Sequence, residues 1–250
     1  MTGLVIGGLA AIAFVAFATE AALGFAGTVL TMSLGAQLVP LDVLLPVFVP
    51  INLLLSLSIA LVDWRQVEWR ALLLELCPPV ALGAAAGLAL FRMPARLHLQ
   101  LAFGIFVFLL AALDLLRLRG DAEAVPRRWT RRVLLVAGGM AHGLFGAGGP
   151  MFVYVLRRRF DGKAAFRATL AVVWLVLNGL LVANYALMDL YNLDLAPAMV
   201  AMVTVLGPAF YIGDRLHRRV DPDVFHRIVV VVLLGAGAVL AVRTAIELTP

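Results

Sequence analysis

The sequence has few charged residues and only one cysteine, and each scarcity excludes classes of protein. Charged residues make up 14% of the 250 positions, about half of the roughly 25% found in soluble domains. With Cys77 alone, neither an internal disulfide nor a cysteine metal site can form. These shortages exclude a secreted disulfide scaffold and argue against a soluble enzyme, a disordered tail and a coiled coil.

Apolar residues, by contrast, are abundant. They make up 63% of the chain, against a usual share of about 45–50%, and the mean hydropathy is +1.02. A soluble fold cannot bury so much apolar surface, so the sequence predicts an integral membrane protein. The net charge of +5 then indicates loop cations that set membrane orientation, with no nucleic-acid partner. The N-terminal apolar run lacks a positive start and continues, so we interpret it as mature protein rather than a signal peptide.

Eight apolar segments are candidates for membrane helices, which need about 20 apolar residues each. They cover residues 3–41, 43–62, 71–91, 97–113, 133–156, 168–188, 195–213 and 228–242. The first and fifth segments each carry a glycine-rich break, and these breaks read Gly24-Phe25-Ala26-Gly27-Thr28 and Gly146-Ala147-Gly148-Gly149-Pro150.

The distribution of loop cations favours a particular path for the two broken segments. If all eight segments cross once, the Lys and Arg residues divide 11 to 9 between the two sides. If the first and fifth segments enter, turn near the middle and leave on the same side, the division becomes 17 to 3. The second arrangement obeys the positive-inside rule. Ordinary tilted helices with packing glycines remain the alternative.

The sequence therefore predicts an all-α polytopic membrane protein made of two inverted four-element repeats, each a re-entrant broken-helix hairpin plus three transmembrane helices. An offset of 122 residues aligns Gly24 with Gly146 and Glu20 with His142. Such repeats are typical of secondary transporters that hold substrate near the membrane midplane. Both termini are then expected on the outer side. The first repeat covers residues 1–120, with its hairpin at 3–33 and helices at 43–62, 71–91 and 97–116; the second covers 121–250, with 131–156, 168–188, 195–213 and 225–245.

The two breaks have a chemistry of their own. Thr28 is suited to capping or opening the second arm of the first hairpin, and Pro150 to the first helical position of the other. Both second arms would point their N-termini, with free N–H groups and partial positive charge, at a common space. An anion site then forms without a buried arginine or lysine. Its expected lining is the ten break residues together with Asn52, His142 and Asn178.

Two ionisable residues lie within the broken segments. A charged, unpaired Glu20 would cost about 2–4 kcal/mol there, so it is protonated, paired with His142, or part of a proton relay. Glu20 and His142 are the candidates for coupling proton movement to anion movement. The alternative is that His142, Asn52 and Asn178 only make hydrogen bonds between helices.

Two other classes of function were weighed. A membrane enzyme needs a nucleophile with a base, or a metal cluster; the chain has neither a G-x-S-x-G nor an H-E-x-x-H motif, and its four histidines are dispersed. We therefore expect no catalytic residues, metal or cofactor. A structural subunit has no need of paired breaks with ionisable residues beside them.

The motifs GFAGT at 24–28 and GLFGAGGP at 143–150, in a chain of this length, resemble the sulfite exporter TauE/SafE family, also called the toluene sulfonate uptake permeases. The first break differs in having Ala26 and Thr28 where the family commonly has glycines. The resemblance implies a secondary transporter of the bacterial inner membrane that moves a small sulfur-containing anion, such as sulfite, sulfoacetate or another organosulfonate. Export coupled to the proton gradient is the leading interpretation, and import of a sulfonate or small carboxylate is the alternative. A homodimer is compatible with the apolar faces.

Overall fold

The computed structural model describes residues 1–92, 96–117, 127–156, 160, 162–219 and 222–248, and this part of the chain is helical without any strand. The all-helical prediction is therefore confirmed. The expected boundary between the repeats, at residues 120 and 121, lies outside the described residues. The α-helices are α1 (Gly3–Leu23), α2 (Gly27–Gly35), α3 (Leu41–Asp63), α4 (Trp69–Ala71), α5 (Cys77–Phe91), α6 (Arg96–Arg117), α7 (Arg128–Phe145), α8 (Gly149–Leu156), α9 (Lys163–Leu187), α10 (Ala196–Arg219) and α11 (Pro222–Leu248).

Three short turns of other helix types, η1 (Trp64–Gln66), η2 (Leu72–Leu76) and η3 (Leu193–Leu195), extend these elements. Within the described residues, six helical stretches are long and apolar enough to cross a membrane. They are Gly3–Leu23, Leu41–Gln66, Trp69–Phe91, Ala164–Leu187, Leu193–Arg219 and Val230–Leu248. Large apolar side chains such as Leu82, Val200 and Val239 remain exposed on α5, α10 and α11. These faces suit contact with lipid and not with water.

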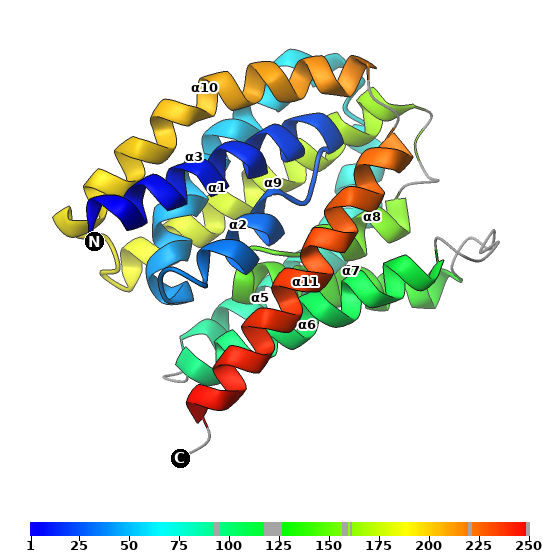
Figure 1. The fold of residues 1–250 in the computed structure, drawn as a ribbon. Coiled ribbons are helices and arrows are strands. Elements are labelled where there is room, and N and C mark those ends of the chain that lie inside the picture. Colours follow the sequence, from blue (N-terminus) through cyan, green and yellow to red (C-terminus); the bar gives the residue numbers. More distant parts are fainter. Residues whose placement is uncertain (93–95, 118–126, 157–159, 161, 220–221, 249–250) are drawn as a thin grey trace.

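Two long helices, α1 and α7, stop inside the bundle, and each is followed by a short helix that packs back against it (Figure 1). The two arms are unequal, with 21 and 9 residues around the first break and 18 and 8 around the second. At about 1.5 Å per residue, α1 is as long as a hydrocarbon core of about 30 Å. The first arm is thus a nearly full-length helix and not the half-helix expected, because the helical run before the glycines is the longer one.

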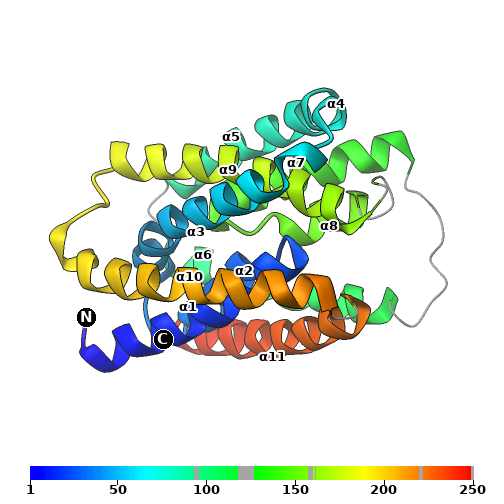
Figure 2. The same ribbon diagram turned by 90° about the horizontal axis from the view of Figure 1, so that it is seen from above.

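The helices pack in four main pairs. The central pair is α3 with α9, and the others are α1 with α10, α5 with α7, and α6 with α11 (Figures 1 and 2). Every pair joins one helix from residues 1–117 to one from residues 127–248. The two halves of the chain are therefore interleaved and do not form separate domains.

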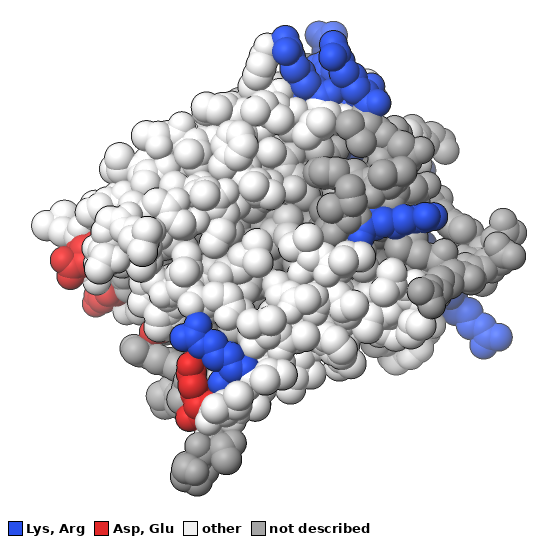
Figure 3. All heavy atoms as spheres, in the orientation of Figure 1, with Lys and Arg blue, Asp and Glu red and all other residues white. Residues whose placement is uncertain are grey.

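The two ends of the bundle differ in charge. At the right-hand end of Figure 1, three helices end (α3, α6 and α10) and three begin (α7, α9 and α11). At the opposite end, α1 begins and α11 ends. On the face seen in Figure 3, Lys and Arg gather towards the first end, while Asp and Glu mark the opposite end beside a basic side chain. The described basic side chains on this face thus gather at the end of the bundle where α7, α9 and α11 begin.

Backbone contact between α5 and α7 depends on small residues. A Cβ added at Gly83 would collide with the Val136 carbonyl oxygen, and one at Gly139 with the Val80 carbonyl oxygen. Helices associate this closely in membranes where small side chains let the two backbones meet.

We expect Gly83→Ala to lower the free energy of unfolding by about 1–3 kcal/mol, the usual cost of overpacking, because the added methyl group has only backbone to displace. Gly207→Ala is the matched control, since a Cβ at Gly207 in α10 meets nothing within 4 Å. Thermal unfolding of the detergent-solubilised variants measures both. Equal midpoints for the two variants would show that α5 and α7 are not in backbone contact.

Candidate functional site

The first break reverses the chain by means of two residues with positive φ. Gly24 ends α1 with φ 83°, and its N–H donates to the Glu20 carbonyl oxygen at 2.7 Å. Ala26 precedes α2 with φ 77° and makes no side-chain cap. Left-handed backbone suits glycine and costs roughly 1–2 kcal/mol for other L-residues. The first break therefore holds a strained alanine at the N-terminus of α2.

The carboxyl group of Glu20 lies against this N-terminus. Glu20 is 2% exposed, and a Cβ at Gly27 would collide with its Oε2 atom. The polar groups that approach the carboxyl are the Asn52 side chain and the Thr28 backbone N–H. A carboxyl at a helix N-terminus is favourably placed with respect to the helix dipole.

Thr28 neither caps nor opens α2, the two roles that its sequence position suggested. The helix begins at Gly27, so Thr28 lies inside its first turn. Its hydroxyl oxygen instead accepts from the Asn52 Nδ2 atom at 3.1 Å, and Asn52 is brought there by α3. Ser56, one turn further along α3, donates to the Asn52 carbonyl oxygen at 2.9 Å.

The second break has a similar backbone. Gly146 ends α7 with φ 66°, and its N–H donates to the His142 carbonyl oxygen at 2.7 Å. α8 then begins at Gly149, and Pro150 is its second residue, with a side chain outside the described set. Ala147 and Gly148 are buried between the two helices.

The side chains at the second break differ from those at the first. The His142 ring, 2% exposed, shares a hydrogen bond of 3.2 Å between Nε2 and the Asn178 Oδ1 atom. The same ring stacks on Trp174 with 5.4 Å between ring centroids, and Phe152 stacks on Trp174 at 5.3 Å. The contacts described for Glu20 and His142 do not join the two residues, so the pairing considered from the sequence is absent.

The two breaks are in contact with each other. A Cβ at Gly149, the first residue of α8, would lie 3.6 Å from the Phe25 Cβ and 3.9 Å from the Ala26 nitrogen. A Cβ at Gly146 would lie 3.1 Å from the Thr28 Cγ2 atom. The N-termini of α2 and α8 are therefore neighbours in the interior of the bundle.

The side chain of Trp174 also connects the breaks. Its indole Nε1 donates to the Gly24 carbonyl oxygen at 2.8 Å, and its ring contacts His142 of the other break. Asn178 follows four residues later and lies on the same face of α9. Trp174 lies within an apolar segment of the sequence, at 168–188, and was not among the residues expected to line the site.

Four buried polar atoms around the breaks have no hydrogen-bond partner among the described atoms: Glu20 Oε1, Asn52 Oδ1, His142 Nδ1 and Asn178 Nδ2. Unpaired buried polar atoms are costly and uncommon. The first break thus offers unpaired carboxyl and amide oxygens, and the second offers an amide N–H group and an imidazole nitrogen. Together they can bind a small polar or charged ligand, or water.

Arg167 is the buried residue that sequence analysis misjudged. It was counted among the loop cations, yet it is 2% exposed and donates from Nη1 to the Ala21 carbonyl oxygen near the first break at 2.9 Å. The sequence led us to expect an anion site without a buried arginine, and a buried arginine nevertheless approaches the first break. The signal available in the sequence was the pair of acidic residues, Asp63 and Asp214, at the ends of two other apolar segments.

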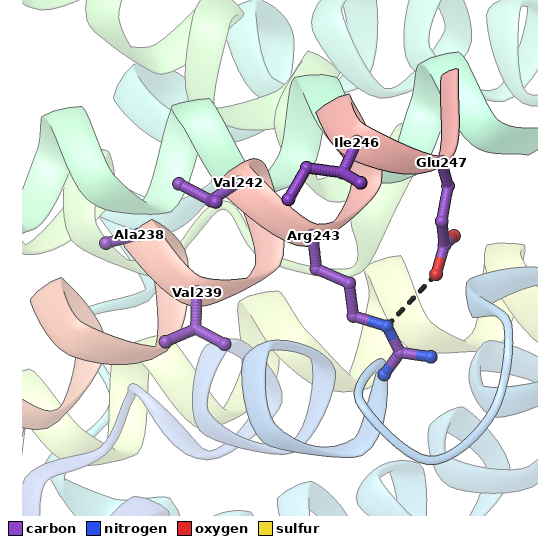
Figure 4. A pocket seen from close by; sticks show the side chains of 6 residues that line it. All are labelled: Ala238, Val239, Val242, Arg243, Ile246 and Glu247. Atoms are coloured by element: carbon purple, nitrogen blue, oxygen red, sulfur yellow. Dashed lines mark hydrogen bonds and ion pairs between the residues drawn. The ribbon is translucent and has the colours of Figure 1, made fainter. Parts of the chain in front are cut away.

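A surface groove of about 540 Å³ lies elsewhere, on α11 (Figure 4). It is lined by Ala238, Val239, Val242, Arg243, Ile246 and Glu247, with Arg243 Nε paired to Glu247 Oε1 at 3.1 Å. None of these residues contributes to either break, so the groove does not belong to the candidate site.

We expect opposite stability changes from two substitutions in the first break. Gly24→Ala lowers the free energy of unfolding by about 1–2 kcal/mol, because φ is positive and the new Cβ would lie 3.2 Å from the Arg167 Cα. Ala26→Gly relieves the strain and raises stability by about 0.5–1 kcal/mol once the added chain entropy of glycine is subtracted. Thermal unfolding checks both signs, and a destabilised Ala26→Gly variant would contradict the strained backbone.

Comparison with known proteins indicates a membrane transporter. Residues 9–240 match the family described as "Sulfite exporter TauE/SafE". The chain is 29% identical over 178 residues to the "Probable inner membrane transporter protein TsaS" of Comamonas testosteroni, which covers 70% of this chain and 73% of the relative. No solved structure matches it significantly. Since the family match spans both breaks and nearly the whole chain, the protein belongs to the sulfite exporter TauE/SafE family of membrane transporters.

Proposed function

We propose that the protein is a secondary transporter that binds a small sulfur-containing anion between the two breaks. The single observation that carries this proposal is the adjacency of the α2 and α8 N-termini, with Gly149 next to Ala26, deep inside the bundle. The first N–H groups of a helix have no intrahelical acceptors and, with the helix dipole, attract anions. The unpaired Asn178 Nδ2 atom adds a side-chain donor close by.

The class of anion comes from the family and not from the geometry. The family description names sulfite, so sulfite, sulfoacetate and related organosulfonates are the substrates we propose, moved outwards across the bacterial inner membrane. Import of a sulfonate or a small carboxylate on the same scaffold is the second candidate, because the same binding groups accept either anion and the gradient sets the direction.

We further propose that Glu20 and His142 couple proton movement to anion movement. Both side chains are 2% exposed and each has one unpaired polar atom, Oε1 and Nδ1 respectively. Each also belongs to the helix turn that ends at a break, so a change in its charge acts directly on the groups around the anion. Protonation of Glu20 would remove a negative charge beside the α2 N-terminus and favour anion entry.

An inverted repeat, 1–120 against 121–250, is supported by reciprocal contacts. Gly24 faces Arg167, and Gly146 faces Leu45; the offset of 122 that relates the two glycines also relates the two facing residues. The pairs α1 with α10 and α5 with α7 exchange under the same operation. The cation-rich end of the bundle is then cytoplasmic, which leaves both termini outside. Exposed apolar faces suit lipid or a second copy in a homodimer.

The transport proposal predicts saturable efflux of labelled sulfoacetate or sulfite from liposomes that contain the purified protein. We expect efflux to exceed that from empty liposomes and to rise when a pH gradient is imposed. Empty liposomes and labelled acetate are the controls, because neutral sulfur dioxide leaks through lipid. Efflux no faster than from empty liposomes would remove the sulfur-anion assignment, and uptake of sulfonates and carboxylates would then test the second candidate.

The position of the site predicts the effect of filling it. Gly149→Leu should reduce efflux at least tenfold, because the side chain would grow into the contact between the two breaks, where the nearest atom lies 3.6 Å from the added Cβ. Gly235→Leu on α11, where a Cβ meets nothing within 4 Å, is the control and should retain efflux. Full activity in a folded Gly149→Leu variant would place the anion elsewhere.

The coupling proposal predicts that Glu20→Gln abolishes the response of efflux to a pH gradient, because the isosteric amide cannot exchange a proton. Glu75→Gln is the matched control, since Glu75 also lies in an apolar segment but is 34% exposed and pairs with Arg131. Efflux at several imposed pH gradients measures the response. An unchanged response in Glu20→Gln would show that Glu20 does not carry the proton.

A further inference from the structure

Arg167, in the second turn of α9, lies at the end of the bundle where α3 and α10 end. Its side chain is 3% exposed. Asp63 is the last residue of α3, and Asp214 lies five residues before the end of α10. These three residues are called the Arg167 cluster below.

The guanidinium of Arg167 is fully used within the protein. Nε and Nη2 donate to the Asp63 Oδ2 atom at 2.8 and 2.5 Å. Nη1 and Nη2 donate to the Asp214 Oδ1 atom at 3.0 Å each, and Nη1 also donates to the Ala21 carbonyl oxygen at 2.9 Å. An arginine side chain has five N–H groups, so no donor is left over for a substrate anion. The role of Arg167 is therefore to hold elements together.

The elements that it holds surround the first break. Through the Arg167 cluster, α9 is tied to α3, to α10 and to the last turn of α1. The Arg167 Cα would lie 3.2 Å from a Cβ on Gly24. The cluster therefore lies between the first break and the cation-rich end of the bundle.

The opposite end of the bundle has no matching ion pair among the described residues. The offset of 122 that relates Gly24 to Gly146 relates Arg167 to Leu45, and Asp63 to Tyr185. Leu45 faces Gly146, and Tyr185 packs against Phe91 at 5.3 Å between ring centroids. Arg92, which the same offset relates to Asp214, donates from Nε and Nη2 to the Asn184 Oδ1 atom at 3.0 and 2.7 Å. One end is thus closed by ion pairs, and the other by apolar and aromatic contacts together with hydrogen bonds from one arginine to a neutral amide.

The exposure of the cluster suits contacts that can separate. The guanidinium is buried, but the side chains of Asp63 and Asp214 are 15% and 19% exposed. Two carboxylates that already touch water lose less solvation in the paired state than fully buried ones, so the desolvation cost of the closed state is limited. When the ion pairs break, water replaces the guanidinium as the partner of the carboxylates. Apolar side chains that separate over an equal area have no favourable contact with water to replace the one they lose.

We propose that the Arg167 cluster is the gate at the cation-rich end of the transport route, closed in this conformation. It opens when α9 parts from α3 and α10, which exposes the first break to that side. The inference rests on the proposed transport function, but it concerns which contacts close the route and not which anion moves.

The test measures access of a thiol reagent to a residue behind the gate. Ser56 lies on α3 two turns before Asp63 and is fully buried. In a Cys77→Ser background, Ser56→Cys should react slowly with a charged, membrane-impermeant thiol reagent supplied from the cation-rich side. Gln66→Cys, exposed in η1 at that end, provides the reference rate. Adding Asp63→Asn or Asp214→Asn should raise the labelling rate of Ser56→Cys at least tenfold.

The matched control removes the other arginine of Asp214. Arg218 pairs with the Asp214 Oδ2 atom at 2.9 Å, but it is 68% exposed and lies on α10 like Asp214 itself, so this pair does not tie α10 to another helix. Arg218→Gln should leave the labelling rate unchanged. If Asp63→Asn fails to fold, the labelling rate in Asp214→Asn alone tests the gate. The Asp214 carboxyl is the more exposed of the two, so its replacement disturbs the fold less.

Unchanged labelling in a folded aspartate variant, or an equal rise in Arg218→Gln, would overturn the gate. Because labelling requires no substrate, a failure of the sulfur-anion assignment leaves the result standing. Anion efflux together with unchanged labelling would retain the transporter and reject the gate.

Discussion

A helix that stops inside an apolar bundle leaves its last carbonyl groups without intrahelical donors, and the structure is arranged around this constraint. In a low-dielectric interior each such group needs a partner. Donors for the end of α1 come mostly from other helices. The Glu20 carbonyl oxygen accepts from the Gly24 N–H at 2.7 Å, and the Ala21 carbonyl oxygen accepts from the Arg167 Nη1 at 2.9 Å. The Ala22 carbonyl oxygen lies 2.6 Å from the His217 Nδ1, and the Gly24 carbonyl oxygen accepts from the Trp174 Nε1 at 2.8 Å. The polar side chains near the first break are thus required by the backbone before any ligand is considered.

The same requirement brings the two breaks together. α9 must approach α1 closely for Trp174 to reach the Gly24 carbonyl oxygen, and that approach also places its indole ring against His142. Asn178 on the same face of α9 then reaches His142. α3 acts similarly through Asn52, which reaches Thr28. One central helix pair therefore satisfies the broken helices and positions the candidate binding groups at the same time.

Local features of the sequence predicted the helices and the breaks, whereas long-range partners decided the rest. Glycines in apolar runs mark both breaks because only they readily adopt the left-handed cap. No local feature of the sequence predicted the positive φ of Ala26. With Ala26 as the N-cap, α2 begins at Gly27, and Thr28 lies inside the helix. Hydropathy placed Arg167 at the edge of an apolar segment, in a loop. Its burial depends on Asp63 and Asp214, which lie 104 and 47 residues away in the sequence. The residues next to Arg167 therefore could not predict these ion pairs.

The two breaks share a backbone geometry but differ in chemistry, and this difference gives the proposed repeats separate tasks. Glu20 and Asn52 present unpaired oxygen atoms at the first break, while Asn178 presents an unpaired N–H group at the second. An anion is repelled by the first set and attracted by the second as long as Glu20 is charged. In the coupling that we propose, protonation of that one carboxyl changes the first break from a surface that repels an anion to one that admits it, and this change links proton binding to anion binding.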